Sequence, residues 1–443
     1  MRKIIFLVIA AFVVLGGCAS TASVKEEAAP SEGNAIVYLA YLWVTQVDGR
    51  RVSWNPMKQY EIAAGSHQLE WNMYVGENRI AYSTSRGFFE EGKTYYLIGI
   101  REGGGINIRT VLEIIEKVQP QSQITLPKPR PYSYSRAFIT YNPDGSLLVI
   151  PNGKALEIYN VRDGTLVKTL AGHSKDVTAG TWSRDGAKII SGDEGGTVKI
   201  WDAAAGSEIR SIGGQKGNVS ALEATPDGTK FVGSSGNILK VWDIASGTEL
   251  VSINDFALNN AESISIPISP NGRYFAALFK DSMRVYPING GKPVFAIERG
   301  KIPYIDVFAP LAFQDDNTLL AYRSGREVSG LAAVDISSGE VTMKNPARFY
   351  RAVYSTGGER IITLGGGSIC FIRIVDAETG GPVTKLTPPL SNYTSYIKAF
   401  DVSPAENTIA TLSNDGIRLW NFESVGKPDA ASNAADTEYV NAQ

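Results

Sequence analysis

The sequence is poor in the residues that most often build reactive sites. Its 443 residues include only two histidines and two cysteines. The histidines, His67 and His173, lie more than a hundred residues apart, and no run of carboxylates has calcium-loop spacing, so no metal site is expected. A Ser-His-Asp set is not expected either, because a nucleophile needs a base beside it. These shortages predict a protein that is not an enzyme and that uses no cofactor.

Positive charge and long apolar runs are also scarce. The formal net charge is −2, whereas a nucleic-acid-binding protein needs a basic surface, so no nucleic-acid partner is expected. The apolar run at residues 4–15 is shorter than the roughly 20 residues that span a bilayer. It follows Arg2 and Lys3, and this order of charged and apolar residues is typical of a secretory signal.

The apolar run ends in Leu-Gly-Gly-Cys at residues 15–18, which resembles the lipobox of bacterial lipoproteins. The resemblance implies a signal peptide at 1–17 and lipid chains, palmitate among them, on Cys18. An ordinary secretory signal with a chance cysteine is the alternative. Ala19, rather than Asp, implies an extracytoplasmic protein of the outer membrane if the source has two membranes. Cys370 is then left without a disulfide partner, and we expect a buried, inert thiol.

Composition divides the rest of the chain. Residues 18–33 are small and acidic and predict a flexible tether, and residues 425–443 predict a disordered tail. Residues 34–117 contain apolar, β-prone runs separated by Gly-rich turns, which predict a small β-sandwich. Its pieces "VDGRRV", "AAGSHQLEW" and "GKTYYLIGI" resemble the PEGA-type domains of bacterial envelope proteins. With no other metal ligand nearby, His67 is expected to have a structural role.

The remaining chain repeats itself, and such a period is the mark of a repeat architecture. Strand ends such as "IWDAAAG" (200–206) and "VWDIASG" (241–247) recur seven times, at separations of 41 to 48 residues. Turns such as "SRDGA" (183–187) and "TPDGT" (225–229) recur in step with them. Two markers with the same period therefore predict seven units.

The Gly-His pair at 172–173 and the Trp-Asp pair at 201–202 give these units a resemblance to the WD-repeat β-propeller, over residues 132–424. The resemblance implies an all-β, seven-bladed ring of four-stranded sheets. In that family a His, a Ser or Thr, an Asp and the Trp form a hydrogen-bonded chain that stiffens a blade. The expected structural blade residues are His173, Ser191, Trp201, Trp242 and Trp420. The aligned Asp position holds Gly195, with Asp193 two residues early, so we expect the chain of blade two to be incomplete or rearranged.

The other blades have no histidine. Each carries at the position of His173 a side chain that can hydrogen-bond, and we expect the same structural role for all of them. These residues are Tyr132, Gln215, Asn259, Tyr304, Asn345 and Tyr393.

The last unit has no apolar fourth strand, because the chain runs into a polar tail after "GIRLWNF". The linker at 118–131 contains "QITLP" (123–127), and we predict that this segment completes the last blade. The sandwich would then be coupled directly to the ring.

Recognition remains once chemistry has been set aside. The loops that lead into the first strand of each blade share one face of a propeller, and Arg and Tyr are enriched where binding energy concentrates. The candidate partner-binding face therefore comprises Arg323, Arg326, Arg348 and Tyr396. The alternative is that these side chains form a solvated rim.

Together these features predict a lipid-anchored envelope lipoprotein whose propeller is a scaffold for an envelope protein partner. One alternative is a module that binds glycan or a small ligand in the central channel. Another is a glycan-active hydrolase, which would need two close carboxylates at the channel mouth. The sequence determines neither the partner nor the oligomeric state.

Overall fold

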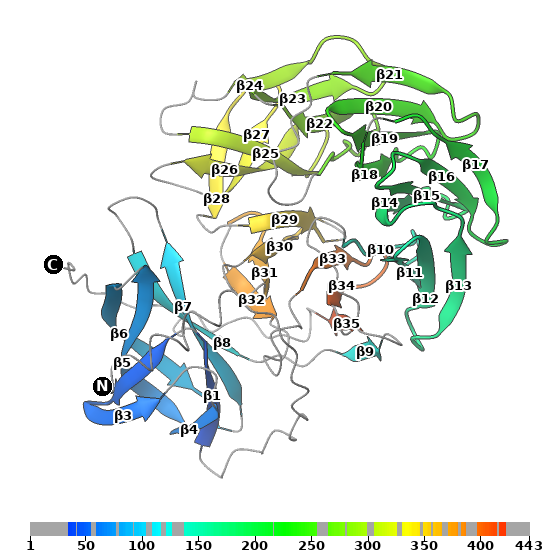
Figure 1. Ribbon diagram of the computed structural model, residues 1–443. Coiled ribbons are helices and arrows are strands. Elements are labelled where there is room, and N and C mark those ends of the chain that lie inside the picture. Colours follow the sequence, from blue (N-terminus) through cyan, green and yellow to red (C-terminus); the bar gives the residue numbers. More distant parts are fainter. Residues whose placement is uncertain are drawn as a thin grey trace, which may run out of the picture.

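The computed structural model describes residues 34–421 except for 41, 55–58, 77–78, 92, 103–108, 117–120, 126–136, 216, 255–264, 280, 299–304, 326–329, 346–348, 356–357, 366–370, 380–381, 387–396 and 414–415. Within these residues every regular element is a β-strand (Figure 1), which confirms the all-β prediction. No helix that could cross a membrane occurs in this described part.

The first unit is a β-sandwich of two four-stranded sheets. One sheet has the order β4-β1-β7-β8, with β1 (Asn34–Ala40), β4 (Gln59–Ala63), β7 (Thr94–Glu102) and β8 (Arg109–Glu116). The other has the order β3-β2-β5-β6, with β2 (Trp43–Val47), β3 (Arg50–Trp54), β5 (Gly65–Gly76) and β6 (Arg79–Phe89). All pairs are antiparallel except β1 with β7.

The sandwich closes because alternate residues of both sheets are apolar and face each other. Val37 and Leu97 from the first sheet pack in one cluster with Leu69, Trp71 and Phe89 from the second. Trp71 is buried and its Nε1–H donates to Ser85 Oγ at 3.1 Å, so its polar atom is satisfied inside the core.

Seven further sheets follow around a ring (Figure 1), which confirms the predicted propeller. The first three blades are regular and four-stranded. Blade one contains β10 (Thr140–Tyr141), β11 (Leu147–Asn152), β12 (Ala155–Asn160) and β13 (Leu166–Ala171). Blade two contains β14 (Val177–Trp182), β15 (Lys188–Asp193), β16 (Val198–Asp202) and β17 (Glu208–Ile212). Blade three contains β18 (Val219–Ala224), β19 (Lys230–Ser235), β20 (Ile238–Asp243) and β21 (Glu249–Ile253).

Blade four has three regular strands, β22 (Tyr274–Leu278), β23 (Ser282–Pro287) and β24 (Phe295–Glu298). Before β22, the described residues 265–273 form a single isolated bridge, between Ile268 and Phe275, and no regular strand. Pro267 has no N–H to donate to a ladder, which explains why regular pairing stops there. Blade five is four-stranded, with β25 (Ile305–Phe313), β26 (Thr318–Gly325), β27 (Gly330–Asp335) and β28 (Val341–Asn345). Blade six is four-stranded as well, with β29 (Phe349–Tyr354), β30 (Arg360–Gly365), β31 (Phe371–Asp376) and β32 (Pro382–Leu386).

Blade seven is completed by a strand from before the ring. Its own strands are β33 (Ala399–Val402), β34 (Thr408–Ser413) and β35 (Gly416–Asn421), and β9 (Ser122–Thr125) pairs antiparallel with β35. This is the segment that the sequence assigned to ring closure. Five residues, 117–121, separate β9 from the sandwich strand β8.

Apolar contacts between blades hold the ring. Each of seven buried clusters combines residues of two neighbouring blades, and one of them joins blade one to blade seven. In the cluster between blades one and two, Val149 and Ile158 pack with Ile189 and Trp201. A blade therefore buries both of its faces only inside the closed ring.

The repeated turns of the sequence have a local cause. In "SRDGA" the Asp185 carboxylate accepts from Ser183 Oγ at 2.5 Å and from the N–H of Ala187 at 3.0 Å. Gly186 follows with a φ of 69°, a conformation that favours glycine. The same Asp or Asn with Gly pattern recurs in other blades because each blade repeats this hairpin geometry.

Candidate functional site

A chain of hydrogen bonds runs through the interior of blade two. Trp201 Nε1 lies 2.7 Å from Ser191 Oγ, Ser191 Oγ lies 2.7 Å from His173 Nε2, and His173 Nδ1 lies 3.0 Å from Asp193 Oδ2. All four side chains are buried. The chain joins the strands β15 and β16 to the loop that precedes β14, so it fixes one end of the blade.

The donors of this chain have one consistent direction when His173 is neutral. Trp201 can only donate, so Ser191 Oγ accepts from it and gives its own proton to His173 Nε2. His173 Nδ1–H then donates to the Asp193 carboxylate. Burial is the largest influence on His173 and lowers its pKa below the usual value, although the hydrogen bond to Asp193 opposes that shift.

The sequence did not predict that Ser191, His173 and Asp193 would meet at these distances, which resemble those of a nucleophile, a base and an orienting acid. Ser191 has no exposed surface, and the side chains of His173 and Asp193 have none either. Ser191 Oγ also accepts from Trp201 Nε1–H, which occupies one of its two lone pairs. No substrate atom can reach this serine in the closed blade, so the arrangement favours a structural role.

Of the two outcomes expected for the chain of blade two, incomplete or rearranged, the structure shows a complete chain with a rearranged aspartate link. Asp193, two residues before the aligned Gly195, provides it. Its second oxygen, Oδ1, accepts from the N–H groups of Gly195 and Thr197, each at 2.9 Å. The carboxylate therefore lies at the start of a tight turn and faces back to His173, a geometry that spacing alone does not reveal.

Two other blades hold their tryptophan differently. In blade seven Trp420 Nε1–H donates to Thr411 Oγ1 at 2.8 Å, which keeps the last link of the chain. In blade three the position of Ser191 is Gly233, and Trp242 stacks on Phe231 with ring centroids 4.9 Å apart. Among the described residues Gln215 donates to Gly213 O, at 3.4 Å, and to no other group. The expectation that Gln215 takes the role of His173 is therefore wrong. Gly233 offers no hydroxyl to which it could connect.

The predicted partner-binding face is only partly visible. Arg323 lies in β26, opposite Phe308 and Gly330, and its side chain is not described. Arg326, Arg348 and Tyr396 lie outside the described residues, as does the lipid-attachment residue Cys18. The face therefore remains a prediction, and so does the anchor.

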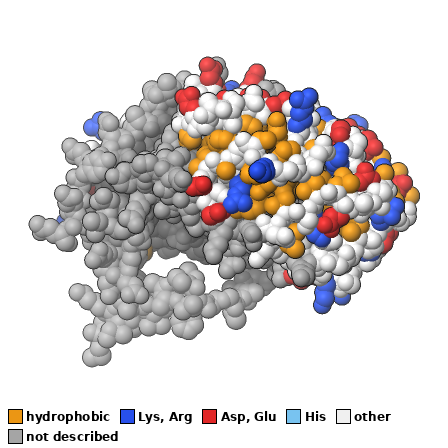
Figure 2. Space-filling view, turned by 90° about the horizontal axis from the view of Figure 1, so that it is seen from above, with side chains coloured by type: hydrophobic (Ala, Val, Ile, Leu, Met, Phe, Trp, Pro, Cys, Tyr) orange, Lys and Arg blue, Asp and Glu red, His pale blue; other side chains and the backbone are white. Residues whose placement is uncertain are grey.

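A second surface was missed by the sequence reasoning. Among the described residues, most exposed large hydrophobic side chains lie on or beside the outermost strands of blades one to four. They are Leu166, Val167, Ile209, Leu250 and Val294, each 47–50% exposed. We call these five residues the outer row. Figure 2 views the molecule from the side on which β21 and β24 lie at the top of Figure 1, and hydrophobic side chains gather there among charged ones.

Three residues of the outer row, Val167, Ile209 and Leu250, have a structural origin in β-bulges. Trp201 pairs with Glu208 and Ile200 with Arg210, so Ile209 is an extra residue without a partner on β16. Leu250 has the same place on β21. A bulge leaves its extra residue out of the ladder and turns the strand. The sequence signal was an aliphatic residue at a fixed distance after the strand-end marker of blades one to four.

Contacts between neighbouring blades keep the outer row in register. Arg210 on β17 donates to Ala245 O, in the turn of the next blade, at 3.3 Å. Lys168 on β13 likewise donates to Ala204 O. A Cβ added to Gly247 would lie 2.3 Å from Arg210 Cδ, so this glycine permits the close approach. The spacing of the outer row is thus set by blade-to-blade contacts.

In the sandwich, His67 has the structural contacts expected for it. Its Nδ1 lies 2.6 Å from Asp48 Oδ2 and its Nε2 lies 2.8 Å from Ala63 O. Asp48 Oδ1 accepts from the N–H of Gln68 at 2.8 Å. This backbone bond, followed by the bond to His67, lowers the pKa of Asp48. His67 therefore fastens the β2–β3 turn to β5, and within the described residues no group of three or more His, Cys, Asp or Glu could hold a metal ion.

Comparison with known proteins identifies the repeats. The model of the WD domain, G-beta repeat, matches residues 164–202 and 206–243. The chain is also similar to an uncharacterized WD repeat-containing protein of Synechocystis, with 34% identity over 97 residues. That match covers 22% of this chain and 28% of the relative, so the chain spans less than a third of its length.

Solved structures agree on the fold. The β-propeller domain of Myceliophteria thermophila Cps50 (Swd1) superimposes with a TM-score of 0.54 at 16% identity, over 68% of this chain and 99% of that domain. A chain of the mitotic checkpoint complex superimposes with a TM-score of 0.57 at 14% identity, over 68% of this chain and 94% of its own length. At such identities the likeness establishes the propeller and nothing beyond it.

Proposed function

We propose that this WD-repeat propeller is the non-enzymatic docking unit of an extracytoplasmic lipoprotein, which is held at the membrane by lipid on Cys18 and binds an envelope protein. WD-repeat propellers generally serve as scaffolds for protein partners. The PEGA-like sandwich would stand between the anchor and the ring, as the order of the chain requires.

The outer row carries this proposal. A large exposed apolar group is costly in water, and contiguous apolar patches on soluble proteins mark interaction sites. Here Val167, Ile209 and Leu250 occupy equivalent bulges of blades one, two and three, which a random distribution over the surface would not produce. The buried state of Ser191 supports the non-enzymatic part of the proposal.

The test is crosslinking and pull-down of the intact lipoprotein from its own membranes. An outer-row variant, Ile209→Ser with Leu250→Ser, is compared with a variant of the sequence-predicted face, Arg348→Ala with Tyr396→Ala. Phe88→Ser is the matched control, because Phe88 is 52% exposed but belongs to the sandwich strand β6.

We expect one envelope protein in the wild-type and Phe88→Ser pull-downs and its loss from the outer-row variant. Loss from the Arg348/Tyr396 variant alone would move the docking site to the loop face. Recovery of no protein above background from wild type would contradict the docking proposal and direct attention to glycan binding or hydrolysis.

A further inference from the structure

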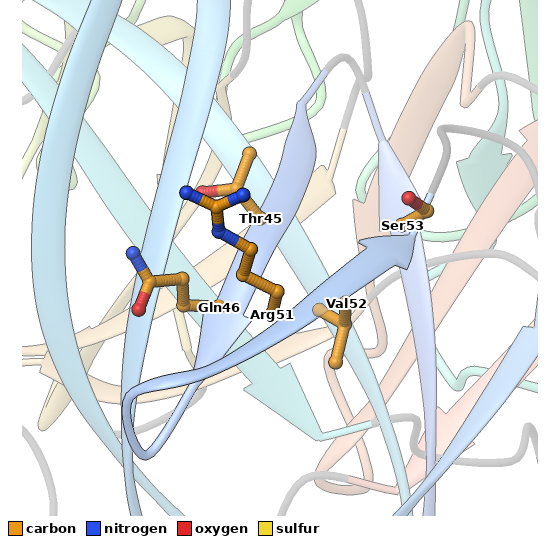
Figure 3. Close-up of a pocket in the computed structure, with 5 residues that line it drawn as sticks. All are labelled: Thr45, Gln46, Arg51, Val52 and Ser53. Atoms are coloured by element: carbon orange, nitrogen blue, oxygen red, sulfur yellow. The ribbon is translucent and has the colours of Figure 1, made fainter.

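A pocket opens on the sandwich, apart from the propeller. It has a volume of about 320 Å³ and is lined by Thr45, Gln46, Arg51, Val52 and Ser53. Figure 3 shows Arg51 extending from β3 alongside Thr45 and Gln46 of β2. The hollow has a cause in the register. Val44 pairs with Trp71 and Gln46 with Glu70, which leaves Thr45 bulged out of the ladder with β5, and two residues of β3, Val52 and Ser53, lie opposite Thr45 on the other side.

The pocket offers an uncompensated positive charge. The Arg51 side chain is exposed and has no hydrogen-bond or ion-pair partner among the described residues. Its neighbour Arg50 differs, because Arg50 helps to lower the pKa of Asp48 and so acts on that carboxylate. Successive side chains of a strand point to opposite faces, so Arg51 is directed away from Asp48.

The other polar groups of the pocket are fixed and leave acceptors free. Gln46 Nε2–H donates to Glu70 Oε2 at 2.5 Å, so the amide is oriented with Oε1 as its remaining acceptor. Thr45 Oγ1–H donates to Glu70 O at 3.1 Å, which leaves the hydroxyl oxygen able to accept. The pocket thus presents one guanidinium donor beside two acceptors that need hydroxyl or N–H donors.

We propose that this pocket binds an acidic sugar, with the Arg51 guanidinium holding the sugar carboxylate and Gln46 and Thr45 accepting from its hydroxyl groups. A guanidinium binds a carboxylate through two parallel hydrogen bonds. A phosphate dianion fits less well, because the Glu70 carboxylate beside Gln46 would repel a doubly charged ligand more strongly. Hydroxyl groups adjacent to a carboxylate are the pattern of a uronic acid.

The sheet face beyond the pocket suits a second sugar ring. Trp43 is half-buried on β2 and shares the outward face with Gln46, because they pair with Asn72 and Glu70, which flank the buried Trp71 on β5. Asn72 pairs with Trp43 across the sheet and is also half-buried. An aromatic ring beside a side-chain amide can contact the apolar face and the hydroxyl groups of a sugar at once.

Calorimetric titration of the full chain in detergent micelles tests this inference, with digalacturonate, neutral galactobiose and inorganic phosphate as probes. We expect Arg51→Ala to weaken digalacturonate binding by about 10- to 100-fold, the effect of losing a charge-assisted hydrogen-bond pair. Arg50→Ala is the matched control and should change the affinity by less than about 2-fold, because Arg50 lies outside the pocket. Arg51→Lys should be intermediate, since it keeps the charge and loses the paired donors.

Three outcomes would overturn the inference: equal digalacturonate affinity in wild type and Arg51→Ala, equal affinity for galactobiose, or tighter binding of inorganic phosphate. Absence of digalacturonate binding at millimolar concentration would overturn it as well. The outer-row variant should bind digalacturonate as wild type does, so failure of the docking proposal and failure of this one are separate results.

Discussion

Blades two and three are neighbours with the same WD signature, yet they hold the same tryptophan by different forces. In blade two Trp201 ends a buried polar chain through Ser191 and His173. In blade three Gly233 replaces the serine and Trp242 stacks on Phe231, with an interplanar angle of 14°. Both tryptophans reach the same burial, at 1% and 2% exposure.

The comparison shows that apolar packing, and not the polar chain, determines the shape of a blade. Both blades contribute to a common cluster that contains Ile200 and Trp242, and both have the same bulge in their outer strand. The polar chain instead determines which substitutions destabilise a blade, because each buried donor or acceptor must keep its hydrogen-bond partner. Blade two is therefore expected to be more sensitive to single polar substitutions.

The largest difference is expected at the ends of the two second strands. Asp193→Ala removes the acceptor of His173 Nδ1–H and of two backbone N–H groups, and should lower the free energy of unfolding by about 3 kcal/mol or more. Ser235→Ala, at the matching place in blade three, loses a bond to Gly217 O and should cost about 1 kcal/mol. Urea midpoints followed by tryptophan fluorescence measure both. Equal losses would contradict the distinction between the blades.

Blade seven gives an intermediate case, because it keeps the last polar link. Thr411→Val preserves shape but leaves the buried Trp420 Nε1–H without its acceptor, and should cost about 1–3 kcal/mol. Thermal unfolding measures this loss of stability. The control is Thr408→Val, which removes a hydroxyl at the start of the same strand. A smaller loss for Thr411→Val than for Thr408→Val would show that the indole bond contributes little.

Stacking in blade three should contribute less. Phe231→Leu keeps an apolar side chain but removes the aromatic pair with Trp242, and should cost about 0.5–1.5 kcal/mol beyond the change in buried area. Ile189→Leu, at the same place in blade two, is the control, because Ile189 pairs with Trp201 as an aliphatic residue and forms no aromatic pair with it. The two chemical-denaturation midpoints are compared, and an equal shift would argue against a specific role for stacking.

The smallest effect concerns pH. Burial lowers the pKa of His173, so the unfolded chain takes up the proton first as the pH falls. The stability that neutral His173 contributes is complete above the unfolded value of about 6.5 and is lost as the pH falls below it. The stability difference between wild type and His173→Gln should therefore shrink from pH 7.5 to pH 5.5. A difference that grows over this interval would show that the histidine is charged in the folded chain.

Much of the fold followed from the period of the sequence, and the details of the site did not. The seven units, the sandwich and the closing strand near Ile124 were all visible as apolar runs between turns. The position of Asp193 could not be predicted in this way. A tight turn brings the Asp193 carboxylate to His173 although Asp193 lies two residues before the aligned position, which an alignment counts as a mismatch. The role of Gln215 failed for a related reason: a donor is useful only if its partner exists, and Gly233 removed that partner.

Surface features were the least predictable. Val167, Ile209 and Leu250 of the outer row lie at bulges, and the regular spacing of aliphatic residues does not by itself show that they leave the ladder. The pocket at Arg51 likewise depends on a bulge, at Thr45, in the ladder with β5. In both cases one residue leaves a ladder, and only the register across the sheet shows which residue it is.

The closing strand has a consequence for the order of events during synthesis. Ser122 pairs with Leu419, about 300 residues later, so the first propeller strand to be synthesised can pair only after the last one has been made. Until then β9 and the open edge of blade one have no partner strand, on a chain that is still being synthesised. The sandwich, complete by β8, can fold long before. Closure of the ring therefore depends on the late pairing of β9 with β35. A truncation that removes only β35 would leave six finished blades without a closed ring.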